Sequence, residues 1–76
     1  MKDNLSEILN EPVTKHSVNI AGHPTSISLE KSFWEALKEI AHTNNKSVAQ
    51  LIGEIDDARS INLSSAIRLY VLHHLE

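Results

Sequence analysis

The side chains of this chain best suited to chemistry are five histidines and a short run of carboxylates. His73 and His74 are adjacent, and adjacent residues on a helix point about 100° apart, so the two do not chelate one ion. The carboxylates of Glu54, Asp56 and Asp57 have no Ser/His/Asp arrangement or glycine-rich phosphate loop beside them, which is typical of a solvated helix end. The sequence therefore predicts no metal site, no cofactor and no enzymatic activity.

The length and composition indicate a small soluble domain. The chain has 76 residues, no cysteine and a net charge of −3, which excludes disulfides and thiolate metal sites and does not favour a strongly basic nucleic-acid binder. No stretch approaches the ~20 apolar residues of a membrane span, and no signal peptide is evident. We expect a cytoplasmic protein without a membrane partner. Because one core of this size contributes only about 3–5 kcal/mol, we also expect an oligomer.

Residues 25–29 alternate strictly between polar and apolar side chains, which predicts a strand. Since successive side chains of a strand lie on opposite faces, Ile27 and Leu29 should point at the following helix, whereas Ser26 and Ser28 should point away from it. So short a strand needs a partner for its backbone hydrogen bonds, and the same segment of a second subunit is a natural candidate.

A second alternating segment, residues 15–21, predicts another strand. The intervening Gly22, His23 and Pro24 are a turn signal that could fold the two strands into a hairpin. Because proline cannot donate a ladder hydrogen bond, Pro24 should mark the first residue of its strand or an edge.

Three helices are predicted after the strands. Residues 31–42 carry one apolar stripe, and Ser47 with Gln50 forms a capping box that starts a second helix, which should end near Ala58 or Arg59. Residues 66–75 predict a third helix, whose apolar stripe is broad enough to fit a subunit interface.

Two backbone positions between and within these helices are unusual. The turn at residues 43–46 contains two asparagines, which tolerate the left-handed conformation that ends a helix. Gly53 lies in mid-helix at some cost in stability, and one possible reason is a close approach to a neighbouring helix.

The chain divides into a predicted mobile arm, residues 1–14, and a domain, residues 15–76. The arm is polar apart from one apolar cluster that could make a helical turn or two before a proline stops it, formed by Leu5, Ile8 and Leu9.

The order of these elements resembles the ribbon-helix-helix proteins, the group of the Arc and MetJ type repressors. The matching residues are Thr25-Ser26-Ile27-Ser28-Leu29-Glu30, Phe33-Trp34-Glu35-Ala36-Leu37, and Ser47 with Leu51 and Ile52. More closely, Ile20-Ala21-Gly22-His23 and Asn62-Leu63-Ser64-Ser65-Ala66 resemble a bacterial subfamily of short ribbon-helix-helix domain proteins. The resemblance implies a mostly α-helical fold with a short β-ribbon, as an intertwined homodimer, here with an extra N-terminal strand and a third C-terminal helix.

The resemblance also implies function. Family dimers insert an antiparallel ribbon into the DNA major groove and act as transcription regulators, with outward side chains reading base edges and a helix N-terminus holding a phosphate. The base-facing positions would be Pro24, Ser26 and Ser28, and the phosphate contacts Lys46, Ser47, Val48 and Lys15. On the adjoining strand His16, Asn19 and His23 could supply further contacts. The implied dimer core is Ile27, Leu29, Trp34, Leu37, Leu51, Ile52, Ile67, Tyr70 and Val71.

Blander interpretations of the same residues stay open. Ser26 and Ser28 could be no more than the solvated side of an amphipathic strand, and Lys46 and Ser47 no more than a turn and a helix cap. The alternative function is a dimeric protein-interaction module with weak or no sequence-specific DNA binding. The net negative charge and the absence of Arg or Lys near Pro24 favour that alternative.

Overall fold

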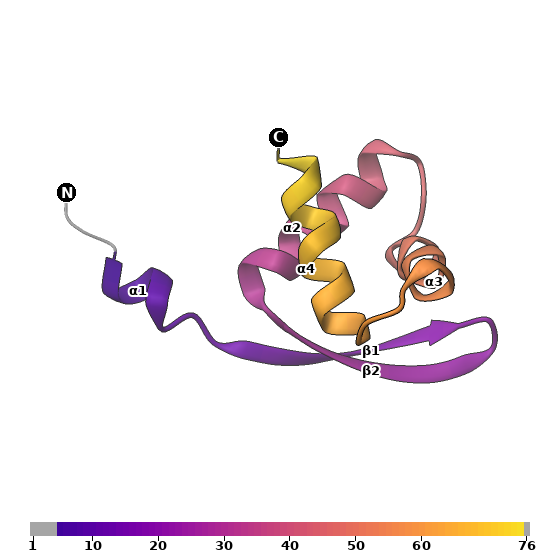
Figure 1. The fold of residues 1–76 in the computed structure, drawn as a ribbon, viewed down its shortest axis with the longest axis horizontal. Coiled ribbons are helices and arrows are strands. Elements are labelled where there is room, and N and C mark those ends of the chain that lie inside the picture. The colour runs from indigo at the N-terminus through magenta and orange to yellow at the C-terminus, as the bar shows by residue number, and fades with distance from the viewer. Residues whose placement is uncertain (1–4, 76) are drawn as a thin grey trace.

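The computed structural model describes residues 5–75 and arranges them as a hairpin covered on one side by helices. Figure 1 shows the helices of the domain on the same side of the hairpin, with the first helix standing apart from them. The other side of the hairpin is therefore left uncovered by helices. The elements in order are α1 Leu5–Leu9, β1 Val13–Ile20, β2 His23–Glu30, α2 Lys31–Thr43, α3 Val48–Ala58 and α4 Leu63–His74.

The predicted hairpin is confirmed, but the predicted position of its turn was wrong. The turn is at Ala21 and Gly22, whereas His23 and Pro24 already belong to β2. The two turn residues have φ angles of 51° and 83°, the left-handed pair that a two-residue turn needs to match the twist of its strands. Ile20 pairs with His23 beside the turn, and the antiparallel register continues from there to the other end of the hairpin. The backbone partner of the 25–29 segment is thus a strand of the same chain.

The inner face of the hairpin supplies part of the core, as the alternation predicted. The side chains of Ile27 and Leu29 are 2% and 0% exposed. Val18 and Ile20 of β1 pack against them and against the other core residues. The buried hydrophobic side chains of the described residues come from β2 and three helices, namely Ile27, Leu29, Leu37, Ala41, Leu51, Ile52, Ile55, Ile67 and Val71.

Side-chain caps begin the last two helices. The hydroxyl of Ser47 accepts a hydrogen bond from the Gln50 amide at 3.0 Å, the predicted cap of α3. The side-chain oxygen of Asn62 accepts from the Ser65 amide at 2.9 Å, which starts α4 at Leu63, three residues earlier than the apolar stripe suggested.

The end of α2 follows the asparagine prediction. Asn45 has a φ of 58°, and beyond it the Lys46 amide donates back to the Ala41 carbonyl at 2.9 Å. The interpretation of Gly53 was wrong, because a Cβ there would meet the Ile20 side chain of β1 at 3.5 Å, an ordinary contact with a strand and not with a helix.

Seven of the nine residues predicted for a dimer core are buried within the single chain to 2% exposure or less. Trp34 and Tyr70 are partly buried and pack against them. Their role in a dimer stays a prediction. The outer part of the broad α4 stripe is exposed, with Leu69 and Leu72 at 50% and Leu75 at 72%.

The N-terminal segment forms the short helix α1 and then joins β1 two residues before the predicted domain start. Residues 1–4 of the predicted arm lie outside the described residues. No residue of α1 is buried, yet Glu11 accepts a hydrogen bond from the Ser32 amide at 3.1 Å and another from the Ser32 hydroxyl. The segment is thereby attached to the start of α2, and its assignment as a separate mobile arm stays a prediction.

Within residues 5–75, each helix is too short or too polar to cross a bilayer.

Candidate nucleic-acid interface

The outer face of the hairpin is an exposed polar surface. It is formed by alternate residues of both strands, which pair across the ribbon as Lys15 with Ser28, Ser17 with Ser26, and Asn19 with Pro24. All six are exposed, and the helices lie on the opposite side of the hairpin (Figure 1). The set contains one lysine, three hydroxyls, an amide and no carboxylate. It can therefore donate to and accept from a polar partner without repelling an anionic one.

The three predicted base-facing residues, Pro24, Ser26 and Ser28, thus lie side by side on this face. Ser17 joins them opposite Ser26. It was predicted to share a strand face with Asn19 but was not included among the site residues. The signal that could have placed it there is its position between Lys15 and Asn19 at a spacing of two.

The predicted phosphate contacts fall into two places. Lys46, Ser47 and Val48 come together at the start of α3, where the first amides of the helix lack intrahelical partners. The first turn of α3 borders the turn end of the hairpin, because Gln50 lines the same shallow hollow as Asn19. Lys15 lies four residues from Asn19 along β1, about 13 Å away, toward the other end of the ribbon.

Lys46 already has an anionic neighbour. Its Nζ lies 2.6 Å from an Oε1 of Glu54, and the two side chains are 33% and 47% exposed. Pairs this exposed are worth only about 0–1 kcal/mol. Lys46 can therefore exchange Glu54 for another anion at small cost.

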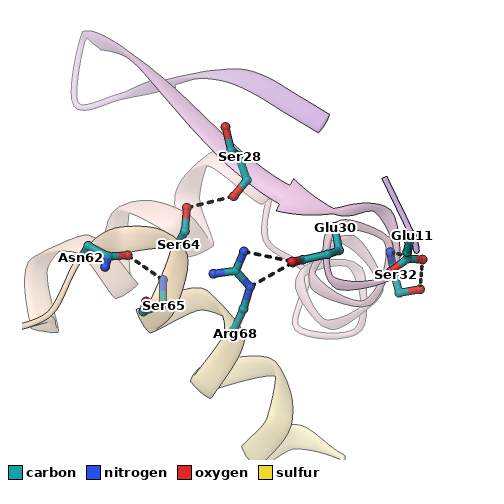
Figure 2. A network of polar contacts seen from close by, with 8 residues as sticks. All are labelled: Glu11, Ser28, Glu30, Ser32, Asn62, Ser64, Ser65 and Arg68. Atoms are coloured by element: carbon teal, nitrogen blue, oxygen red, sulfur yellow. Dashed lines mark hydrogen bonds and ion pairs between the residues drawn. The ribbon is translucent and has the colours of Figure 1, made fainter. Parts of the chain in front are cut away.

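A polar network joins the end of β2 to α4 (Figure 2). Arg68 donates from Nε and Nη2 to the two carboxylate oxygens of Glu30, at 2.9 and 3.3 Å, and its guanidinium lies 5.9 Å from the centre of the Phe33 ring. These hydrogen bonds, with one from the backbone of Glu30, lower the pKa of that carboxyl below its ordinary value. One turn earlier, the Ser64 hydroxyl donates to the Ser28 carbonyl at 3.0 Å.

Comparison with known proteins places this geometry in a family. A model of the ribbon-helix-helix domain matches residues 13–75. The chain belongs to the ribbon-helix-helix domain family. Domains of this family generally bind DNA as transcription regulators and are typically non-enzymatic.

Among solved structures, the ribbon-helix-helix chain is similar to an uncharacterized protein from Bordetella pertussis Tohama I. The two share 26% identity with a TM-score of 0.71, over 96% of this chain and 69% of that one. A search of curated proteins found no match.

The histidines of the ribbon-helix-helix chain do not extend the polar face as expected. His16 stacks on Trp34 at 3.9 Å between ring centres and 8° between planes, which places it on the helix side of the hairpin. His16 and His23 also lie apart along the hairpin, because their cross-strand partners are Ile27 and Ile20. Within residues 5–75, no three His, Asp or Glu side chains gather closely enough to hold a metal ion.

Sequence reasoning missed the contacts that anchor the third C-terminal helix to the ribbon. Neither the Arg68–Glu30 pair nor the Ser64–Ser28 hydrogen bond was expected, because both join residues more than 35 positions apart in the sequence. The available signal was weak. Glu30 ends the strand and Arg68 is the one base in α4 before its histidines.

Proposed function

We propose that this protein binds double-stranded DNA as a homodimeric transcription regulator, with the outer face of its ribbon in the major groove. The observation that carries the proposal is that face itself, which between residues 15–19 and 24–28 is exposed, free of carboxylates and lined by hydrogen-bonding side chains. The major groove is about 12 Å wide and admits a two-stranded ribbon. Family membership supports the same function. We place it in the cytoplasm of a bacterium, as the bacterial source of the similar structure suggests.

In this proposal the short side chains of Ser26 and Ser28 contact base edges, with Pro24 beside them as an apolar surface. A serine hydroxyl both donates and accepts, so it can bond any of the four bases and discriminates among them less than a long bidentate side chain does. We therefore expect modest sequence preference, with the rest of the specificity coming from DNA shape.

Phosphate contacts position the protein. Lys46 leaves Glu54 for a backbone phosphate, which also accepts from the free amides at the Ser47–Val48 start of α3. Lys15 reaches a second phosphate from the far end of the ribbon. In a dimer each contact occurs twice, and the fold sets the distance between Lys15 on β1 and Lys46 in the turn before α3.

The test is a DNA titration on mixed genomic fragments at several salt concentrations, after a light-scattering measurement of mass. We expect a dimer that binds DNA at low salt. The logarithm of its binding constant should fall with the logarithm of the salt concentration, with a slope of about −0.9 per phosphate contact. Replacing both Ser26 and Ser28 by Ala should weaken binding to preferred sequences, whereas Lys46→Ala should weaken all fragments about equally. No binding to any fragment at low salt would overturn the proposal.

A second candidate is a protein-interaction module. It is favoured by the exposed side chains of Leu69 and Leu72 on α4 and of Leu75 just after it, and by the net charge of −3. A stable dimer with no affinity for DNA, in which Leu72→Glu abolishes binding to a protein partner, would favour it over the first.

A further inference from the structure

One carboxylate lies in the outer rows of the hairpin. The alternation that places Ser26 and Ser28 outward continues to Glu30, the last residue of β2, which pairs with Val13 across the ribbon. Glu30 is the one acidic member of the two outer rows, which are residues 13, 15, 17 and 19 of β1 and residues 24, 26, 28 and 30 of β2. Left uncompensated, its charge would repel a DNA backbone that approaches this face.

The charge of Glu30 is close to the proposed DNA surface and persists at neutral pH. Two residues along a strand lie about 7 Å apart, so Glu30 is within one Debye length of Ser28, roughly 8 Å at physiological ionic strength. Salt therefore screens its repulsion of a nearby phosphate only in part. A hydrogen bond from the Arg68 side chain, with one from the backbone of Glu30, lowers the pKa of the carboxyl below its ordinary value, so a proton does not neutralise it.

Arg68 of α4 supplies the compensating charge. Its Nε and Nη2 donate to the two carboxylate oxygens of Glu30 at 2.9 and 3.3 Å, the paired geometry in which a guanidinium binds a carboxylate strongly. The guanidinium also lies 5.9 Å from the centre of the Phe33 ring, a favourable distance for a cation over an aromatic face. Figure 2 shows the two charged side chains directed toward each other between β2 and α4. The guanidinium is therefore held by both the carboxylate and the ring.

We propose that Arg68 masks Glu30 and so keeps the DNA-facing side of the ribbon free of net negative charge. The proposal rests on the DNA binding of the proposed function and adds to it a residue that lies outside the outer face. With the pair formed, the charge that the outer rows present to DNA is that of Lys15. Without Arg68, the charge of Glu30 would oppose that of Lys15. Arg68 is thus a positioning residue that acts through Glu30 and needs no contact with DNA.

A charge-matched set of variants tests the masking. Arg68→Met keeps an unbranched side chain beside Phe33 but leaves Glu30 without its cation, and it adds one negative charge to the chain. The double variant, Arg68→Met with Glu30→Gln, removes both charges and restores the net charge of the parent. Lys38→Met is the control, because it removes the cation of an exposed pair with Glu35 on α2 and changes the net charge by the same amount.

The variants are titrated with mixed genomic DNA fragments at several salt concentrations, after circular dichroism has tested that each is folded. We expect Arg68→Met to bind DNA roughly tenfold more weakly than the parent at low salt, with the gap narrowing as salt screens the repulsion. The double variant should bind as the parent does, and Lys38→Met should lose much less than Arg68→Met. Glu30→Gln alone should bind at least as tightly as the parent, and this variant tests the proposal if Arg68→Met does not fold.

The outcomes separate the masking from the proposed function. A weakened Arg68→Met that Glu30→Gln does not restore would mean that Arg68 itself contacts phosphate, which overturns the masking and leaves the proposed DNA binding standing. Unchanged binding by Arg68→Met, an equal loss in Lys38→Met, or weaker binding by Glu30→Gln alone would overturn the masking as well. A parent that binds no fragment at low salt overturns the proposed function, and the masking falls with it.

Discussion

The two faces of the hairpin are built from the same eight-residue strands but have opposite roles. On the inner face Ile27 and Leu29 are buried completely, while their neighbours Ser26 and Ser28 are exposed on the outer face. The difference teaches that one alternating pattern can carry stability and a binding surface at once. It also means that substitutions one residue apart should separate the two properties.

The largest expected effect is on the inner face. Leu29→Ala removes a side chain of 0% exposure from the core, and we expect a loss of about 2–5 kcal/mol in the free energy of unfolding, measured by urea denaturation. Ser28→Ala is the matched control and should stay within about 0.5 kcal/mol, since only its backbone carbonyl is engaged. Similar losses in both variants would contradict the division of the faces.

The next effect is on the outer face and on binding. Ser26→Asp places a carboxylate at the centre of the proposed DNA surface, so we expect roughly tenfold weaker DNA binding or more, at about 1–3 kcal/mol per lost contact, with little change in unfolding. Ser60→Asp adds the same charge in the exposed loop between α3 and α4. If both variants bind DNA equally well, the outer face is not the DNA surface.

A smaller gain is expected where α3 packs on the inner face. The Cβ of Gly53→Ala would meet the Ile20 side chain at 3.5 Å, an ordinary contact, and alanine favours a helix over glycine. We expect a gain of about 0.5–1 kcal/mol in stability, seen as a higher urea midpoint with an unchanged slope. A loss of stability would show that α3 lies closer to β1 than described.

The smallest effect concerns Glu30, which follows the outer-face alternation yet is held by Arg68. Because Arg68 lowers the pKa of folded Glu30 below 4.5, the charged carboxylate stabilises the fold above that pH. This contribution disappears as pH falls through the lowered pKa. Glu30→Gln should therefore be less stable than the parent near neutral pH, with the gap closing in acid, as thermal unfolding at several pH values would show. A gap independent of pH would point to lost packing instead.

Sequence patterns predicted the local features of this fold well and the distant contacts poorly. The alternation at residues 25–29, the Ser47 cap and the left-handed Asn45 each depend on a few adjacent residues, and all were found as predicted. The partner of the 25–29 strand was left open between the hairpin and a second subunit, because a lone strand does not reveal which edge is satisfied.

The candidate site was predictable to the same extent. Alternation was enough to place Ser26 and Ser28 outward, but the inward stacking of His16 on Trp34 depends on how α2 crosses the hairpin, which no local pattern encodes. The ion pair of Lys46 with Glu54 was not predicted either, because it joins residues eight positions apart in the sequence.

The Glu11 carboxylate has a consequence for where the domain begins. The family match starts at residue 13, yet α2 has no side-chain cap from Glu30 and takes one from Glu11 instead. A chain trimmed to the matched residues would lose that cap, which in other helices is worth about 1 kcal/mol. The similarity boundary and the energetic boundary of this domain therefore differ by two residues, and the second is the one to respect when the domain is shortened or fused.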